Sequence, residues 1–318
     1  MGSAGNRLGA WLRLVRLPNV LTVPGDVLVG FALATADRTA IPADLLAALL
    51  AGPAFYMAGL ILNDLVDVER DRVERPARPL AAGIIGRGAA MQAAVVLLGV
   101  AMLLLGIRGL APLMVGAILG GLIFLYNLRA RRHRALGALV MGLCRAGNVA
   151  LGVAAGAPIA FLHAETIAVL AWWAAYIGAV TWLAAREMDR GAYGRERWLP
   201  MAAVLVGGGF LLFYGEQSHP ISLFRAVFSL AFAVLIIYQS GIRLAMPTRW
   251  KTVSGRIRTQ EPATLYPPAI GGLVSALLPM QAAVIILMSD EAWMLLAALL
   301  MLLAWPVNRW LARKIPAS

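Results

Sequence analysis

The chain is poor in cysteine, histidine and charge. Its 318 residues include one cysteine and three histidines, and 14% of them are charged. The single cysteine, Cys144, excludes a disulfide framework, and the histidines are too scattered for a zinc site of ordinary spacing. So few charges are also untypical of a soluble domain, in which about a quarter of the residues are charged.

Apolar residues take the place of the missing charge, at 61% of the chain with a mean hydropathy of +0.78. Apolar stretches long enough to cross a bilayer core of about 30 Å recur from end to end. They predict an all-α integral membrane protein with a single domain over 1–318. The expected spans are 17–36, 43–66, 88–107, 110–128, 136–157, 164–185, 199–215, 221–244, 267–288 and 291–311.

The basic residues, which give a net charge of +12, gather in alternate loops. The connections after the second, fourth, sixth and eighth stretches are rich in arginine, whereas the other loops carry only Arg38 and Arg108. The positive-inside rule then places both termini and the motif loops in the cytoplasm, and the chain in the cell inner (plasma) membrane. Because the basic residues form no single stripe with interleaved aromatics, we expect no nucleic-acid partner.

Two stretches leave the count open between nine and ten spans. Three consecutive glycines interrupt 199–215, while 267–288 begins with two prolines and contains Pro279, so that either could be a broken or re-entrant helix. The polar segment 246–266 predicts a cytoplasmic loop, either with a short interfacial helix around Trp250 and Arg256 or acting as a lid.

Acidic residues crowd the end of the second stretch, where 63–71 reads Asn-Asp-Leu-Val-Asp-Val-Glu-Arg-Asp. If the helix continues, Asp64, Asp67 and Asp71 share one face, with Asn63 beside them. Converging carboxylates repel one another unless a cation lies between them. Mg²⁺ suits such a site because it binds one or two carboxylates together with phosphate oxygens. The pattern predicts a metal-bridged phosphate ligand.

Arginines follow the acids directly. Arg70, Arg75 and Arg78 can contact phosphate oxygens in a bidentate manner, and Pro76 and Pro79 stiffen the turn that carries them. Acids for a metal beside arginines for phosphate predict a diphosphate site. The alternative is a set of solvated loop charges in surface ion pairs.

One arginine stands in the middle of the fifth stretch. Arg145 must be paired or face a cavity, because an unpaired charge within lipid is costly. With Asn148 close by along the helix, it predicts a contact to the diphosphate or to an acceptor.

Two consecutive motifs resemble the first signature of the UbiA superfamily of intramembrane prenyltransferases, namely Asn63-Asp64-x-x-Asp67-x-x-x-Asp71 and Arg75-Pro76-x-Arg78-Pro79-Leu80-x-x-Gly83. The resemblance extends over residues 10–190. It includes residues similar to the family's opening, Arg13, Arg16, Pro18 and Asn19, and residues similar to its polar pocket, Tyr126 and Asn148.

The resemblance implies a UbiA-like bundle of transmembrane helices around a central cavity with cytoplasmic cap loops. In such a protein Mg²⁺ holds an isoprenyl diphosphate, which ionises and alkylates a hydrophobic or aromatic acceptor within the lipid bilayer. The implied catalytic residues are Asp64, Asp67, Asp71, Arg145 and Tyr126. The implied diphosphate contacts are Asn63, Arg70, Arg75, Arg78, Asn148, Arg186 and Arg190. The implied metal ligands are Asn63, Asp64, Asp67, Asp71, Glu187 and Asp189.

The second signature of the family is degraded in this chain. The family carries Asp-x-x-x-Asp at the end of the sixth span, where this chain has Arg186-Glu187-Met188-Asp189-Arg190-Gly191 within the loop 186–198. Asp189 lies about 200° around a helix from Glu187, so the two acids would not share a face. This departure is similar to UbiA-like proteins of Ebo-type gene clusters. Two rival hypotheses stay open: a terpene cyclase acting on a prenyl diphosphate, and a non-catalytic protein that binds or exports a lipid or metabolite.

Overall fold

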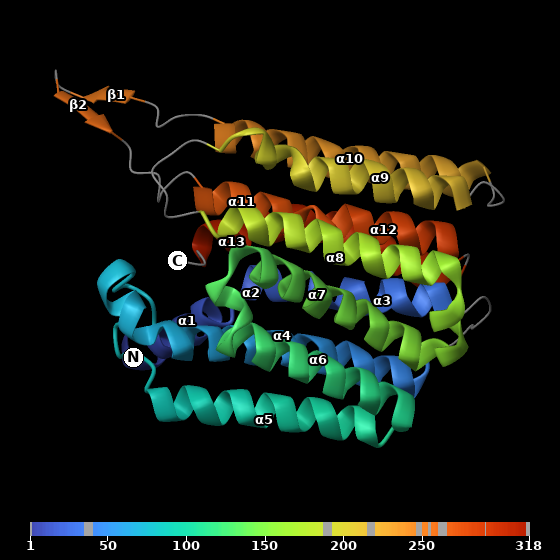
Figure 1. Ribbon diagram of the computed structural model, residues 1–318, viewed down its shortest axis with the longest axis horizontal. Coiled ribbons are helices and arrows are strands. Elements are labelled where there is room, and N and C mark those ends of the chain that lie inside the picture. Colours follow the sequence, from blue (N-terminus) through green and yellow to red (C-terminus); the bar gives the residue numbers. More distant parts are fainter. Residues whose placement is uncertain are drawn as a thin grey trace.

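The computed structural model describes residues 2–34, 41–186, 193–214, 220–245, 250–253, 256–259, 266–289 and 291–315. These residues form a bundle of long helices that run along one common direction (Figure 1). Within these ranges, ten helical segments are long and apolar enough to cross a membrane. The prediction of an all-helical, multi-pass membrane protein is therefore confirmed.

The helices follow one another along the chain with short connections. In order they are α1 (Gly2–Leu14), α2 (Leu17–Val20), α3 (Val23–Ala34), α4 (Ala43–Glu74), α5 (Arg87–Gly106), α6 (Leu110–Leu128), α7 (Arg134–Gly156), α8 (Ala164–Ala184), α9 (Leu199–Tyr214), α10 (Pro220–Ala245), α11 (Tyr266–Ser275), α12 (Leu277–Met288) and α13 (Ala292–Lys314). Short 3-10 helices, η1 (Ala130–Arg132), η2 (Pro158–Leu162) and η3 (Arg195–Trp198), lie in three of the connections.

Prolines explain why two of the expected spans are each built from two helices. Pro24 has no N–H to bond the carbonyl of Val20, where α2 ends, and Pro279 stands in the same relation to Ser275, where α11 ends. In contrast, the three glycines of the seventh stretch lie within the continuous helix α9, Leu199–Tyr214. Of the two stretches that were expected to be broken, the ninth is divided and the seventh is not.

The acidic segment is helical, because α4 continues through it to Glu74 and ends before Pro76. Its 32 residues cover about 48 Å at 1.5 Å per residue, against a bilayer core of about 30 Å. The last turns of α4, which carry the aspartates, therefore project past the apolar layer.

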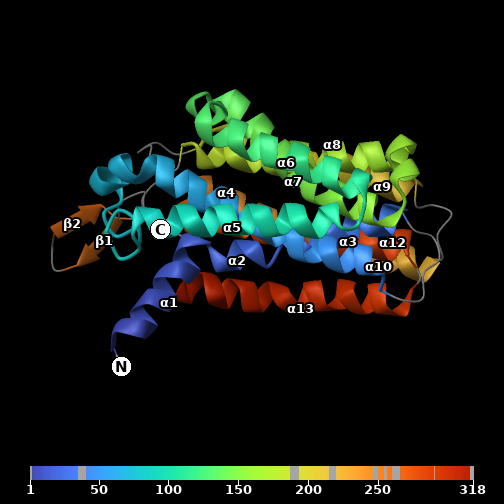
Figure 2. The same cartoon turned by 90° about the horizontal axis from the view of Figure 1, so that it is seen from below.

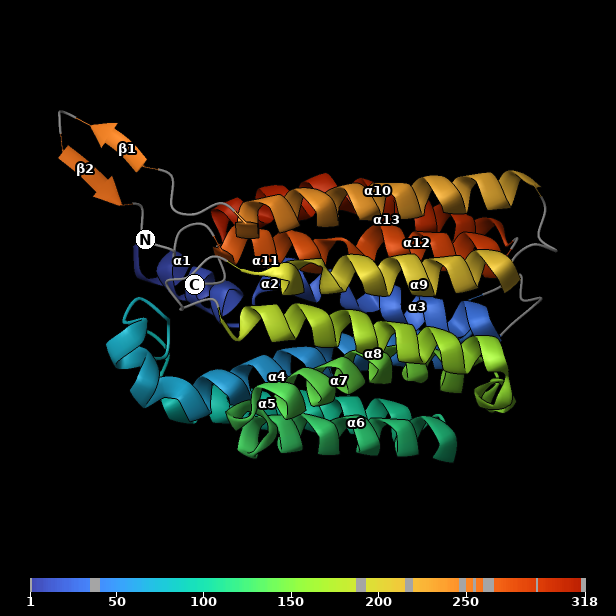
Figure 3. The same ribbon diagram turned by 45° about the horizontal axis from the view of Figure 1, so that its top comes forward.

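The expected interfacial helix around Trp250 and Arg256 is wrong. These residues begin two antiparallel strands, β1 (Trp250–Val253) and β2 (Arg256–Thr259), in which Trp250 pairs with Thr259. β-branched residues such as Val253 and Ile257 favour extended backbone over helix, which accounts for the hairpin. It extends beyond the same end of the bundle as α1 and the last turn of α13 (Figures 1 and 3).

The core of the bundle lies around α3, which packs against α4, α7 and α12. α13 runs along one flank, and α6 and α8 run along the opposite one (Figure 2). Two glycines let α3 and α7 touch: a Cβ at Gly30 would lie 1.8 Å from the carbonyl oxygen of Val149, and one at Gly152 would lie 1.9 Å from that of Val27. Small residues at such crossings allow close backbone packing within membranes.

Candidate active site

Three aspartates share one face of α4, as the spacing predicts. Asp64 and Asp71 are buried, with 4% and 5% of their surface exposed, and Asp67 lies partly buried between them. Because these positions are separated by three and four residues, they follow one another along the same side of the helix. The helix thus brings three carboxylates to the end of the bundle that projects past the apolar layer.

Each aspartate faces an arginine. Arg78 Nη1 lies 2.8 Å from Asp71 Oδ2 and 3.5 Å from Asp64 Oδ1, and Arg16 Nη2 lies 3.4 Å from the same Asp64 oxygen. Arg131 pairs with Asp67. Three carboxylates are thus matched by three guanidinium groups, and the cluster carries no net charge of its own.

The turn after α4 places Arg78 against the helix that precedes it. The Arg78 N–H donates to the Arg75 carbonyl at 3.0 Å, and Gly83 adopts a left-handed backbone (φ 70°) as the chain turns toward α5. Glycine accepts this conformation without the steric cost that a Cβ would add. The predicted Arg-Pro turn therefore returns a basic side chain to the acidic face.

The other predicted arginines of this segment lie elsewhere. Arg70 Nε contacts Glu74 at 2.8 Å on the exposed side of α4. Arg75 caps the helix, and its N–H donates to the Asp71 carbonyl at 2.8 Å. Contacts of either side chain to a diphosphate stay predictions.

A cavity of about 230 Å³ lies inside the bundle next to the aspartates. Four predicted residues line it, from three different helices: Asn63, Tyr126, Arg145 and Asn148. Much of the remaining wall is apolar or aromatic, including Phe55, Tyr56, Leu119, Ile123 and Ile177. Arg16, which contacts Asp64, lines the cavity as well. The aspartate cluster and the cavity are therefore adjacent parts of one site.

Arg145 is both paired and at the cavity wall. Its Nε lies 2.5 Å from Asp26 Oδ2, and its Nη2 donates to the backbone oxygen of Thr22 at 2.9 Å. Two neighbours also donate to Asp26 Oδ1, Trp173 Nε1 at 2.9 Å and Gln281 Nε2 at 2.7 Å. This polar network joins the helices α3, α7, α8 and α12.

Of the second predicted motif, Glu187, Asp189 and Arg190 lie outside the described residues, so their roles stay predictions. Arg186 is described at the end of α8, where it pairs with Glu196 and lies over the Tyr193 ring. Its guanidinium thus has a partner within the loop.

Sequence reasoning missed Asp26 and the pairing of Arg131 with Asp67. Asp26 stood out in one respect, as an acid within an apolar stretch, which is costly in lipid and marks a paired or functional group. No periodicity in the sequence indicates that Arg131, beyond the fourth span, faces the acidic side of α4.

A family model and two sequence relatives show which proteins the chain is similar to. The UbiA prenyltransferase family model matches residues 26–248. A digeranylgeranylglyceryl phosphate synthase from Methanoculleus marisnigri is 29% identical over 194 residues, which cover 61% of this chain and 68% of that protein. One from Saccharolobus solfataricus is 32% identical over 120 residues, 37% of this chain and 42% of that protein.

Solved structures support the same fold at low sequence identity. A UbiA homolog from Aeropyrum pernix K1 in its apo form has a TM-score of 0.63 at 15% identity, covering 84% of this chain and 96% of that one. A UbiA homolog from Archaeoglobus fulgidus bound to GPP and Mg²⁺ has a TM-score of 0.58 at 14% identity, covering 86% and 99%. Membership of the Ebo-type subgroup stays a prediction. With a match over most of its length, the chain belongs to the UbiA prenyltransferase family.

Proposed function

We propose that the chain transfers a prenyl group from an isoprenyl diphosphate to a hydrophobic acceptor within the membrane, with Mg²⁺ as the cofactor. Family membership supports the reaction class. Solved UbiA homologs bound to GPP and Mg²⁺, or to DMAPP and Mg²⁺, support the donor and the metal.

The observation that carries the proposal is the balanced charge of the aspartate cluster beside an apolar cavity. The guanidinium groups of Arg16, Arg131 and Arg78 already form ion pairs with Asp64, Asp67 and Asp71. A diphosphate brought to this cluster would leave an excess of negative charge. A divalent cation held by the aspartates would restore the balance, and the arginines would then be available to phosphate oxygens.

The donor set fits Mg²⁺ bound together with a diphosphate. Over the ranges that the structure describes, no three acidic, histidine or cysteine side chains form a group able to hold a metal by themselves. Mg²⁺ is commonly held by one or two carboxylates and completed by phosphate oxygens and water. The predicted ligands are Asn63, Asp64, Asp67 and Asp71, of which one or two carboxylates would hold Mg²⁺ while phosphate oxygens complete its coordination. Glu187 and Asp189, outside the described residues, are proposed as a second, weaker set. Bound there, Mg²⁺ would neutralise charge on the leaving pyrophosphate.

Residues of the chain itself bind the diphosphate and surround the allyl cation. Arg16 and Arg78 bind the diphosphate while its bond to the allylic carbon breaks, and the electron pair of that bond leaves with pyrophosphate. Preorganised charge of this kind contributes a large part of the rate enhancement in catalysis. The allyl cation then faces the aromatic rings of Phe55, Tyr56 and Tyr126, which favour cations at their π faces. An electron pair of the acceptor forms the new bond to that carbon, and the acceptor releases a proton.

The ion pair at the cavity wall makes this environment compatible with a cation. Asp26 balances the charge of Arg145, so the guanidinium does not repel the allyl cation as a lone arginine would. The apolar wall, which includes Leu119 and Ile177, keeps water from quenching the cation.

We also propose that the aspartate end of the bundle faces the cytoplasm, from where the water-soluble diphosphate head would enter. The arginine-rich loops of this end support that orientation under the positive-inside rule.

The test is incubation of the purified full chain with radiolabelled geranyl, farnesyl and geranylgeranyl diphosphates and Mg²⁺, with and without membrane lipid extract. We expect pyrophosphate release that depends on the extract and falls by at least about 100-fold in Asp64→Asn and Asp71→Asn, since each variant loses a charged group that binds metal or positions Arg78. Glu69→Gln is the matched control, because Glu69 belongs to the same helix but is 67% exposed and faces Arg72 and Arg87.

The outcomes separate the rival functions. Release without extract, with a product made from the diphosphate alone, would replace transfer by cyclisation. No release under any condition, with binding intact in Asp64→Asn, would favour a protein that binds or exports its ligand.

A further inference from the structure

The first helix, α1, is too short to cross the membrane. Its 13 residues cover about 20 Å at 1.5 Å per residue, against a bilayer core of about 30 Å. It precedes the first span, which begins at Leu17. Figure 2 shows that α1 leaves the bundle sideways, past α13, instead of following the direction of the spans. Because the surface of a bilayer lies across its spans, α1 extends along that surface.

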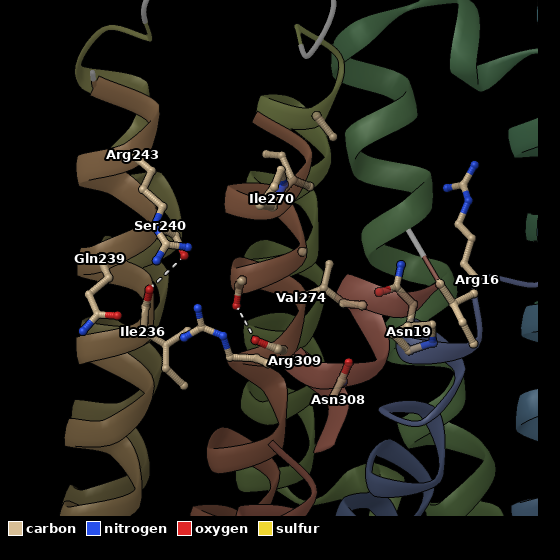
Figure 4. Close-up of a pocket in the computed structure, with 18 residues that line it drawn as sticks. Arg16, Asn19, Ile236, Gln239, Ser240, Arg243, Ile270, Val274, Asn308 and Arg309 are labelled. Atoms are coloured by element: carbon tan, nitrogen blue, oxygen red, sulfur yellow. Dashed lines mark hydrogen bonds between the residues drawn. The ribbon is translucent and has the colours of Figure 1, made fainter. Parts of the chain in front are cut away.

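The direction of α1 is fixed by its junction with α2. The Arg16 N–H donates to the Arg13 carbonyl at 3.0 Å, and the Asn19 N–H donates to the Arg16 carbonyl at 2.8 Å, so one residue ends the first helix and begins the second. Arg16 makes the change of direction with a left-handed backbone (φ 49°, ψ 56°), which is strained for a residue with a Cβ. Asn19 lies next to Asn308 of α13, on the wall of a pocket of about 560 Å³ (Figure 4). Hydrogen-bonded backbone thus joins α1 to the spans.

α1 has two apolar strips, of which the bundle covers one. Ala10 and Leu14, four residues apart, are 0% and 1% exposed. Leu8 and Leu12 are also four residues apart and share a different face of the helix. Leu8 is 63% exposed and Leu12 is only partly buried, while Trp11 lies between the two strips and packs partly against the core. The strip of Leu8 and Leu12 is left open to a partner.

Two arginines flank this open strip. Arg7 directly precedes Leu8 and lies about 100° around the helix from it. Arg13 directly follows Leu12 and lies on the opposite side of the strip. Arg7 is exposed, and Arg13 Nε is buried without a hydrogen-bond partner. The sequence has no acid before Asp26, so the charge of this segment is unbalanced. Arginines beside an apolar strip are typical of a helix that lies in the headgroup region of a bilayer.

Trp310 marks the level of the membrane surface next to α1. Its side chain is 57% exposed, close to the end of α13 at Lys314. Tryptophans at the ends of spans lie at the boundary between lipid tails and headgroups. Since α13 contacts α2, the next helix after α1, the sideways path of α1 begins beside that boundary.

We propose that the open strip of α1 lies in the headgroup region of the bilayer and that Arg7 and Arg13 bind the phosphates of anionic lipids. The unbalanced charge selects this partner, because each arginine close to an anionic membrane surface adds to the attraction. The leucines of the strip need only apolar surroundings, which the upper part of the lipid tails provides. A second copy of the chain on the same strip would instead shield it from lipid, and the test separates these two occupants.

The test places a fluorescent label on α1 of the full chain in nanodiscs of phosphatidylcholine and phosphatidylglycerol. Leu8→Cys carries the label in a Cys144→Ala background, since Cys144 is the single cysteine of the chain. Gly9→Cys is the matched control, because it lies off the strip and a Cβ there meets no atom within 4 Å. We expect lipids with a nitroxide near the top of one acyl chain to quench the label at Leu8, and iodide in the water to quench the label at Gly9.

Two results of this experiment would overturn the proposal. If iodide quenches the label at Leu8 as strongly as the label at Gly9, the strip lies in water. If the label at Leu8 is protected from both quenchers, protein covers the strip, either a second copy of the chain or another partner.

A second arm tests the preference for anionic lipid. The nitroxide is carried either by phosphatidylglycerol or by phosphatidylcholine, at equal mole fractions. We expect the phosphatidylglycerol nitroxide to quench the label at Leu8 at least about twice as strongly. The difference should disappear in Arg7→Gln/Arg13→Gln. Arg225→Gln is the matched control and should keep it, since Arg225 is an exposed arginine near the opposite end of the bundle on α10.

Equal quenching by the two lipids would contradict the anionic partner, as would a difference that survives Arg7→Gln/Arg13→Gln. None of these measurements requires prenyl transfer. A chain that releases no pyrophosphate can therefore still show the lipid contact, and an active chain can lack it.

Discussion

Asp26 in α3 and Arg145 in α7 form an ion pair inside the bundle, with 2.5 Å between Oδ2 and Nε. Both side chains are almost fully shielded, with 0% and 4% of their surface exposed. Thr22 and Gln281 supply further hydrogen bonds. Removing one partner would therefore leave an isolated charge in a medium that cannot hydrate it.

We expect Asp26→Ala to lower the free energy of unfolding by about 3–5 kcal/mol, the range found when one partner of a buried pair is lost. The double variant Asp26→Leu/Arg145→Met should recover most of that loss, because apolar replacements of similar size avoid the uncompensated charge. The measurement is the thermal midpoint in detergent. A midpoint of Asp26→Ala equal to that of the unmodified chain would show that the pair does not stabilise the fold.

Arg16 allows its backbone strain to be separated from its charge. Arg16→Gly and Arg16→Ala both remove the guanidinium and should reduce pyrophosphate release equally. Only glycine accepts the left-handed backbone freely, so Arg16→Gly should be more stable than Arg16→Ala by about 1 kcal/mol. Denaturation of the two variants side by side checks this, and equal stabilities would mean that the strained backbone has relaxed.

Chelation of Mg²⁺ should weaken binding of geranyl thiolodiphosphate by at least about tenfold, because the arginines are already matched by aspartates and a diphosphate alone adds uncompensated charge. Equilibrium dialysis with and without EDTA measures the effect. Asp64→Asn is the control and should bind the diphosphate equally in both buffers. Undiminished binding of the diphosphate in EDTA would rule out the metal's part in recognition.

The crossing of α3 and α7 has no space for a side chain at its glycines. We expect Gly152→Val to prevent the native packing, since its Cβ would lie 1.9 Å from the Val27 carbonyl oxygen. Gly209→Val on α9 is the matched control, because nothing lies within 4 Å of a Cβ there. The amount of monodisperse protein in size-exclusion chromatography distinguishes the two. A monodisperse Gly152→Val protein would contradict the close crossing.

The periodicity of the sequence was sufficient to predict the helices and the acidic face of α4. Asp64, Asp67 and Asp71 needed only a continuous helix to share one side, and α4 provides it. The breaks after Val20 and Ser275 follow from Pro24 and Pro279. A break was expected in 199–215 or in 267–288, so the second of these breaks was among the expectations and the first was not. These features depend on neighbours along the chain.

Contacts between distant helices could not be predicted in the same way. Gln281 and Asp26 are 255 positions apart, and nothing in the local pattern of either span indicates the other. The hairpin was missed because Trp250 and Arg256 suggested an interfacial helix, while the β-branched residues around them determined the backbone.

The buried ion pair also constrains how the chain is made. Arg145 follows Asp26 by 145 − 26 = 119 positions, so at about 5–20 residues per second the ribosome needs about 6–24 s to complete the distance. During that interval Asp26 in the first span lacks the guanidinium group of Arg145, its partner in the folded bundle. Insertion of this span has to tolerate an acid that costs about 2.5–3.5 kcal/mol at the centre of a helix crossing the bilayer. The newly made span therefore depends on the translocon, on water or on a proton until the fifth span arrives.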